Sequence, residues 1–145
     1  MTIDLQLQLL ERVVAALVIG LAFGVEREWT RHFAGIRTMM LVAVGACLFT
    51  EGGYLTLAAH NIDPTRIAAQ VVTGVGFLGA GTIFRAEDRV RGLTTAATIW
   101  LVAALGMAAG FGLYVLAAGA AALCLFLIVA LRAVERRWFP GAQKN

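Results

Sequence analysis

The chain has 145 residues, of which 60% are hydrophobic and 14% are charged. A soluble domain carries roughly 25% charged residues, so this composition excludes an ordinary soluble domain. It predicts an all-α fold, a polytopic bundle of membrane helices that forms one domain over residues 1–145. The net charge of +3 comes from arginines that lie in loops between apolar runs, and we therefore expect no nucleic-acid binding.

Five apolar runs predict transmembrane helices over about residues 5–25, 36–57, 66–84, 93–109 and 113–131. The start of the chain lacks a basic segment and leads directly into a full span, so we expect no cleavable signal peptide. Ten of the twelve basic residues fall on one side of these spans, and only Arg12 and Arg66 fall on the other. The positive-inside rule then predicts an outside N-terminus and a cytoplasmic C-terminus.

The end of the first span and the start of the second carry charges at the expected cytoplasmic edge. Glu26 and Arg27 precede a short loop, and Arg37 and Thr38 follow it. These residues have two interpretations: anchoring at the interface, or a Glu26–Arg37 ion pair that closes the first two helices or shapes a small polar site.

The third span contains the most unusual stretch of the chain. Asp63 and the proline after it are typical of a helix start. No charge occurs between Arg66 and Arg85, and eighteen residues of helix would run ~27 Å, close to the thickness of the hydrocarbon core.

Small residues recur on one face of that span, which favours close helix packing in lipid. We therefore expect Gly76→Leu, in the middle of this face, to push a neighbouring helix away and to lower the amount of folded protein. The residues expected at packing surfaces across the chain are Gly20, Gly24, Ala69, Thr73, Gly74, Gly76, Gly79, Ala80, Gly81 and Gly92.

The segment from Gly74 to Gly79 matches the dinucleotide-binding pattern G-x-G-x-x-G. That motif requires a preceding strand and an acidic residue about twenty positions further on. Here the preceding residues belong to an apolar helix, and residues 98–101 contain no carboxylate. We interpret the glycines as packing residues.

Other polar residues near or within the spans offer few sites for chemistry. Thr94 and Thr95, after Gly92, could either cap a helix or cradle an anion with free N–H groups. Gln70 and Thr73 could bond a neighbouring helix or line an ion or proton path. The histidines and cysteines lack metal-ligand spacing, and no nucleophile stands beside a base, so we expect no metal, no cofactor and no enzyme activity.

Four ordered motifs together resemble the MgtC/SapB family of membrane proteins. They are Gly20-Leu21-x-x-Gly24-x-Glu26-Arg27-Glu28, Ala34-Gly35-Ile36-Arg37-Thr38, the stretch from Asp63 to Ile83, and Val90-x-Gly92-Leu93-Thr94-Thr95-Ala96-Ala97-x-x-Trp100. The resemblance implies a bacterial inner-membrane protein. For members of the MgtC type it implies growth in low magnesium, survival inside phagocytes and restraint of the proton-translocating ATP synthase. Such members carry a further cytoplasmic domain, and the chain looks more like the short SapB-type members.

Two functions are therefore in view. The first is a non-enzymatic regulator that contacts another membrane protein, with the ATP synthase suggested by the resemblance, in adaptation to low magnesium or intracellular stress. The second is an oligomeric transporter or channel subunit for magnesium or another ion. Few carboxylates lie near the span ends, and Mg²⁺ prefers carboxylate oxygens and its own waters, so we favour the first.

Overall fold

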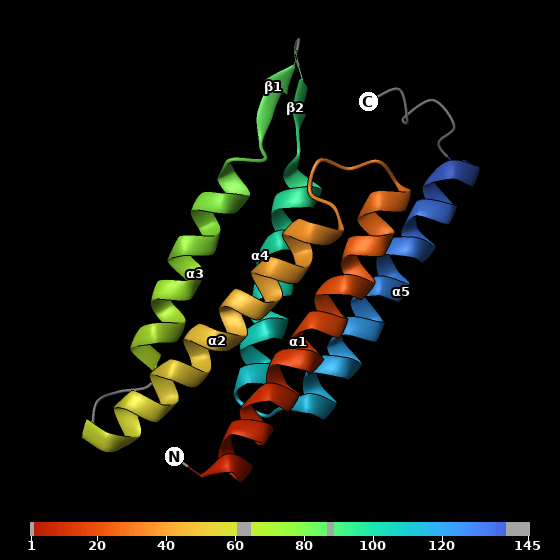
Figure 1. The fold of residues 1–145 in the computed structure, drawn as a ribbon. Coiled ribbons are helices and arrows are strands. Elements are labelled where there is room, and N and C mark those ends of the chain that lie inside the picture. The colour runs from red at the N-terminus through yellow and green to blue at the C-terminus, as the bar shows by residue number, and fades with distance from the viewer. Residues whose placement is uncertain (1, 61–64, 87–88, 139–145) are drawn as a thin grey trace.

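The computed structural model describes residues 2–60, 65–86 and 89–138, and within them it contains five helices and one short hairpin. The helices are α1 (Ile3–Trp29), α2 (Ile36–His60), α3 (Thr65–Ala80), α4 (Leu93–Gly110) and α5 (Tyr114–Trp138). The strands are β1 (Phe84–Ala86) and β2 (Arg89–Arg91). The predicted all-α helix bundle is confirmed, and successive helices run in opposite directions, so that the N-terminus and the end of α5 lie at opposite ends (Figure 1).

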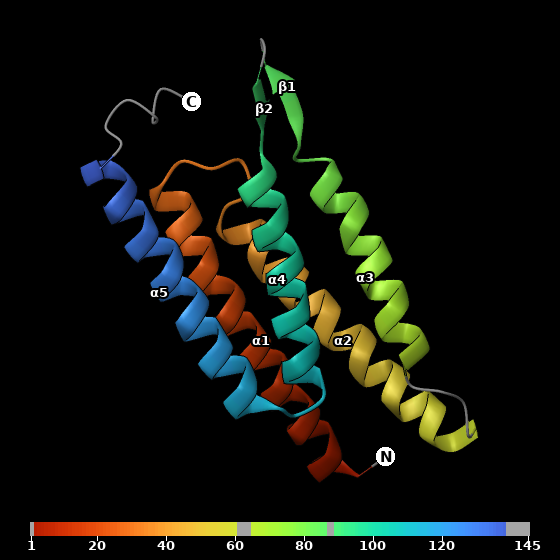
Figure 2. The same cartoon turned by 180° about the vertical axis from the view of Figure 1, so that it is seen from behind.

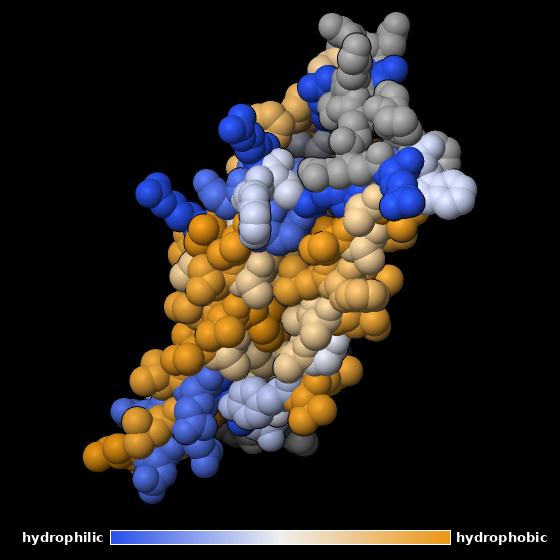
Figure 3. Space-filling view, turned by 90° about the vertical axis from the view of Figure 1, so that its right-hand side faces the viewer, coloured by the Kyte–Doolittle hydropathy of each residue, from blue (hydrophilic) through white to orange (hydrophobic). Residues whose placement is uncertain are grey.

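Four helices, α1, α2, α4 and α5, are long and apolar enough to cross a membrane. Large apolar side chains cover the outside of the bundle: Val115 is 90% exposed and Leu41 is 73% exposed. On the α5 side, the apolar surface forms a band between two polar ends (Figure 3). This is the distribution that a bilayer requires, because hydrocarbon replaces water around the middle of the molecule.

The core lies between α1, α2 and α4, and the view from behind shows α4 lying across α2 and beside α1 (Figure 2). The largest fully buried apolar side chains all come from these three helices: Phe23, Met39, Cys47, Ile99 and Val102. Helix α5 covers α1 and α4 from one side, and α3 packs against α4 and α2 from the other.

Glycine pairs on α1 and α4 hold α2 between them. A Cβ atom at Gly20 would lie 2.7 Å from the Met39 carbonyl oxygen, and one at Gly24 would lie 2.5 Å from Ile36 Cα. On α4, Gly106 and Gly110 approach the α2 backbone in the same way, with a Cβ atom at Gly106 only 2.3 Å from the Ala43 carbonyl oxygen. Both pairs are spaced by four residues, the small-xxx-small arrangement that brings membrane helices into backbone contact.

Helix α3 is shorter than the predicted span over residues 66–84, and it ends at Ala80 after 16 residues, or ~24 Å. Gly81 follows, and a β-favouring run of Thr82, Ile83 and Phe84 leads into β1. Where the sequence indicated a loop between the third and fourth spans, β1 and β2 form an antiparallel pair, in which Arg85 pairs with Val90. Asp63 lies outside the described residues.

Gly92 closes the base of the hairpin. Its φ angle of +91° favours glycine, and a Cβ atom there would lie only 1.9 Å from the Thr82 carbonyl oxygen. Gly92 is also the N-cap of α4, without a side-chain capping bond, so the expected capping by Thr94 or Thr95 is wrong.

The small-residue face of α3, defined as Ala69, Thr73, Gly76 and Ala80, is exposed along its whole length. A Cβ atom at Gly74 or Gly76 would meet nothing within 4 Å. The expected packing of this face against another helix is therefore wrong for the described part of this chain. The buried face of α3 carries Val71, Val75 and Gly79 instead, and a Cβ atom at Gly79 would lie in ordinary contact with α4, 3.5 Å from the Ala96 carbonyl oxygen.

We expect Gly24→Ala to destabilise the fold by about 1–3 kcal/mol, because a methyl group would overlap the α2 backbone, which cannot rotate aside. The measurement is the free energy of unfolding in detergent micelles. Gly119→Ala on α5, where a Cβ atom meets nothing within 4 Å, is the matched control and should lose no stability. Equal stability of the two variants would contradict the backbone contact.

Candidate functional site

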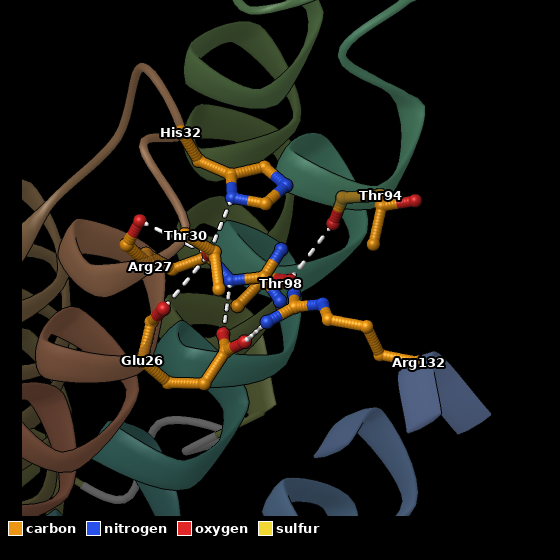
Figure 4. A network of polar contacts seen from close by, with 7 residues as sticks. All are labelled: Glu26, Arg27, Thr30, His32, Thr94, Thr98 and Arg132. Carbon is orange, nitrogen blue, oxygen red and sulfur yellow. Dashed lines mark hydrogen bonds and ion pairs between the residues drawn. The ribbon is translucent and has the colours of Figure 1, made fainter. Parts of the chain in front are cut away.

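A charged cluster lies where the C-terminal end of α1 meets α5 (Figure 4). Arg27 donates from Nε to Oε2 of its neighbour Glu26, and Nη1 of Arg132 lies 2.6 Å from Glu26 Oε1. The Arg27 side chain is fully buried, and that of Glu26 is 10% exposed. Charges at this depth need partners, and here one carboxylate serves two guanidinium groups. The cluster formed by Glu26, Arg27 and Arg132 therefore keeps a net charge of +1.

The position of the cluster follows from the length of α1. The helix continues past the expected end near Val25 as far as Trp29, so Glu26 and Arg27 lie on its last turns. Thr30, the C-cap residue, donates its hydroxyl proton to the Glu26 carbonyl oxygen at 2.8 Å. The same carbonyl oxygen also accepts the backbone N–H of Thr30 at 3.2 Å, so Thr30 closes the end of α1 with two bonds to one acceptor.

His32 borders the cluster from the loop after α1. Its Nδ1 lies 2.6 Å from Thr30 Oγ1. Because that hydroxyl already gives its proton to a carbonyl oxygen, Nδ1 must be the donor. Burial lowers the pKa of His32, and the charges of Arg27 and Arg132 lower it further. The ring is therefore neutral at neutral pH and adds no positive charge to the cluster.

Helix α4 provides the wall opposite Arg27. The Arg27 guanidinium reaches toward α4 beside Thr98, and Arg132 approaches from α5 (Figure 4). Thr95 and Thr98 are buried, and Thr98 donates to the Thr94 carbonyl oxygen at 2.8 Å. Nη1 and Nη2 of Arg27 have no hydrogen-bond partner among the described residues. The cluster thus joins α1 to α5 beside α4, and its net positive charge can attract an anion.

A second polar centre lies at the other end of the bundle. Arg12 on α1 donates from Nη1 to the Gly110 carbonyl oxygen at the end of α4, at 2.9 Å. Glu51 on α2 is only 5% exposed, and the positive charge of Arg12 attracts its carboxylate. In the sequence, Arg12 was assigned to the side with few basic residues, and nothing connected it to Glu51. The available signal was that both charges interrupt apolar runs.

The expected Glu26–Arg37 ion pair is wrong, because the carboxylate of Glu26 is occupied by Arg27 and Arg132. The first turn of α2 presents Ile36 to Gly24 and buries Met39. Arg37 is rotated by about 100° from Ile36 and so points to another side of the helix. Arg37 is exposed, and among the described residues it makes no ion pair.

The other predicted site residues are distributed over separate surfaces. Arg37, Thr38 and Gln70 line a groove between α2 and α3, whereas Thr94 is exposed at the start of α4 and Thr95 is buried. The segment Gly74–Gly79 lies within α3, so it has no strand before it, as a nucleotide-binding turn would require. Within the described residues no group of three or more acidic, histidine or cysteine side chains could hold a metal ion.

Comparison with known proteins gives one family. The model of the MgtC family matches residues 13–137. An uncharacterized protein of Synechocystis sp., slr0014, is 45% identical over 121 residues, which are 83% of this chain and 51% of that protein. Protein MgtC of Salmonella typhimurium is 42% identical over 125 residues, 86% of this chain and 53% of its own length. Protein MgtC of Brucella abortus is 44% identical over 124 residues, which are 86% of this chain and 50% of that protein.

The chain thus spans about half the length of the curated relatives it matches. No solved structure matches it significantly.

We expect Glu26→Gln to destabilise the protein by about 3 kcal/mol, since it leaves the buried Arg27 without a counter-charge. Arg132→Gln should cost less, about 1 kcal/mol, because the Arg132 side chain is 23% exposed and Glu26 keeps Arg27 as a partner. Unfolding free energies of the single and double variants measure the coupling, which should be at least ~0.5 kcal/mol. In a matched double-mutant cycle of Glu26→Gln with Arg37→Gln, the changes in unfolding free energy should be additive. Coupling of Glu26 to Arg37 in place of Arg132 would contradict the assigned pairs.

Proposed function

The chain belongs to the MgtC family of membrane proteins, and from this premise we propose that it is a non-enzymatic regulator in the bacterial inner membrane. It acts by direct helix contact with another membrane protein, in adaptation to low magnesium or intracellular stress. The family resemblance points to the proton-translocating ATP synthase as a partner, and a second copy of the chain is a further one.

The observation that carries this proposal is the exposed small-residue face of α3. Its four residues, Ala69, Thr73, Gly76 and Ala80, point away from the buried face that carries Val71 and Val75. In lipid, helices associate mainly through van der Waals packing, and small residues allow the closest approach. A helix with one packed face and one smooth, unoccupied face is suited to bind a second helix from outside the chain.

An ion transporter is the second candidate function, and one observation favours it. Glu51 is a buried carboxylate whose Oε1 has no hydrogen-bond partner among the described residues. Against it, the other buried carboxylate, Glu26, lies at the opposite end of the bundle in an ion pair. Between the two ends, glycine contacts bring the backbones of α1, α2 and α4 together, which leaves little room for a hydrated ion.

We propose that the chain crosses the membrane five times, with its N-terminus outside. The loop after α1, the hairpin and the end of α5 all lie at one end of the bundle, and they carry most of the arginines (Figure 1). A reporter that is active only in the cytoplasm should work when fused after Asn145 and should fail when fused after Ala59. The reverse pattern would overturn the topology, and activity at both sites would overturn the passage of α3 through the bilayer.

Gly76→Leu should abolish function while the protein accumulates and unfolds as the unaltered chain does, because the new side chain meets open space within the chain. The readout is growth at low magnesium of the host bacterium lacking its own copy of the gene. Gly119→Leu, on the exposed surface of α5, is the matched control and should support normal growth. Normal growth with Gly76→Leu would remove the small-residue face from the mechanism.

Magnesium flux into proteoliposomes that contain the purified chain separates the two candidate functions. The regulator should give no flux above that of empty liposomes. Flux that Glu51→Gln abolishes would establish the transporter instead.

A further inference from the structure

Helices α2 and α3 run antiparallel and leave between them a groove with a volume of about 600 Å³. Apolar side chains line most of it, from Leu41, Val42 and Phe49 on α2 to Val75 and Leu78 on α3. Its walls also contain one glycine from each helix, Gly45 and Gly74, and a Cβ atom at either position would meet nothing within 4 Å. Interiors of proteins are close-packed, so an open groove of this size with apolar walls is suited to an occupant from outside the chain.

One end of the groove is cationic. Arg37 and Thr38 line it where α2 begins, and Arg37 makes no ion pair among the described residues. Thr38 also borders a second hollow of about 430 Å³, which includes Thr82 at the foot of the hairpin. The groove is therefore apolar along most of its length and has a polar end with the guanidinium group of Arg37. This end lies on the side of the bundle that carries most of the arginines.

The size of the groove selects the kind of occupant. A helix with its side chains is ~10 Å across, so even a ten-residue segment would fill more than ~1,000 Å³. An acyl chain is a single row of methylene groups about 4 Å wide, set by van der Waals contact distances. The groove volume falls within the range of small-molecule sites, roughly 300–1,000 Å³. An acyl chain fits such a groove, whereas a whole helix does not enter it.

We propose that this groove binds an anionic phospholipid, with one acyl chain between α2 and α3 and the phosphate on the Arg37 guanidinium. Arginine matches phosphate geometry with two parallel N–H donors, and the Thr38 hydroxyl offers another donor beside it. Basic pockets between membrane helices on the cytoplasmic side are suited to anionic headgroups. The bound lipid replaces the missing side-chain contacts between α2 and α3 and neutralises Arg37.

Native mass spectrometry of the purified full chain in detergent tests this site. The protein is titrated with dioleoyl phosphatidylglycerol and, separately, with dioleoyl phosphatidylcholine, which has the same acyl chains and no net charge. The unaltered chain should bind the anionic lipid about tenfold more tightly, as a charge-assisted contact implies. Arg37→Gln should remove this preference, and Arg137→Gln, an exposed arginine on α5, should keep it. An equal effect of the two substitutions would overturn the headgroup assignment.

Two further variants fill the groove from opposite walls. Gly45→Leu and Gly74→Leu should each reduce the binding of both lipids at least tenfold, while Gly119→Leu on α5 should leave it unchanged. Unaltered lipid binding in both groove variants would overturn the site. A dimer that is lost in these variants, without bound lipid in the unaltered chain, would show that a second copy occupies the groove and would overturn the proposal.

Discussion

The fold depends on the backbone contact that α2 makes with helices on its two sides. Gly20 and Gly24 of α1 touch one side of α2, and Gly106 and Gly110 of α4 touch the other. Lipid tails are as apolar as leucine, so burial of apolar area contributes little to helix association in a bilayer, and close van der Waals packing must replace it. Four positions without a side chain therefore bring three backbones together, and the buried side chains of the core fill the space that remains beside them.

The same contact determines where the charges lie. Once Gly24 meets Ile36, the rotation of α1 about its axis is fixed, and the fully buried Arg27 three residues later is directed toward α4. The rotation of α2 is fixed as well, so Arg37 faces α3 instead of Glu26. At the opposite end, Arg12 reaches the Gly110 carbonyl oxygen, which the end of α4 leaves without a backbone donor. The positions of the two polar centres thus follow from the rotation of the helices. Their bonds reinforce an arrangement that the glycine contacts have already fixed.

How much the sequence could predict depended on whether a feature was local. Apolar runs predicted all five helices, and the four-residue spacing of Gly20 and Gly24 indicated a packing face on α1. The sequence could not show which helix each packing face contacts, because this depends on the rotation of both helices about their axes. The small residues of α3 therefore predicted the wrong buried face. The face that packs inside the chain carries Val71 and Val75, whereas Gly76 lies on an uncovered face. The hairpin was missed because its two strands have only three residues each, and half of these residues are arginines.

Helix α3 differs from the core helices in what holds it. Among the glycines of α3, Gly79 faces another helix, and a Cβ atom there would lie 3.5 Å from the Ala96 carbonyl oxygen, an ordinary contact distance. Cβ atoms at the glycines of α1 and α4 that face α2 would instead overlap its backbone. It is also the shortest helix, and its two ends join α2 and the hairpin. It packs against α4 and α2 with one face, and its other faces are left for contacts outside the chain. Its free small-residue face and the groove beside α2 thus share one physical origin. Both are surfaces of the helix that the glycine-packed core leaves incompletely covered.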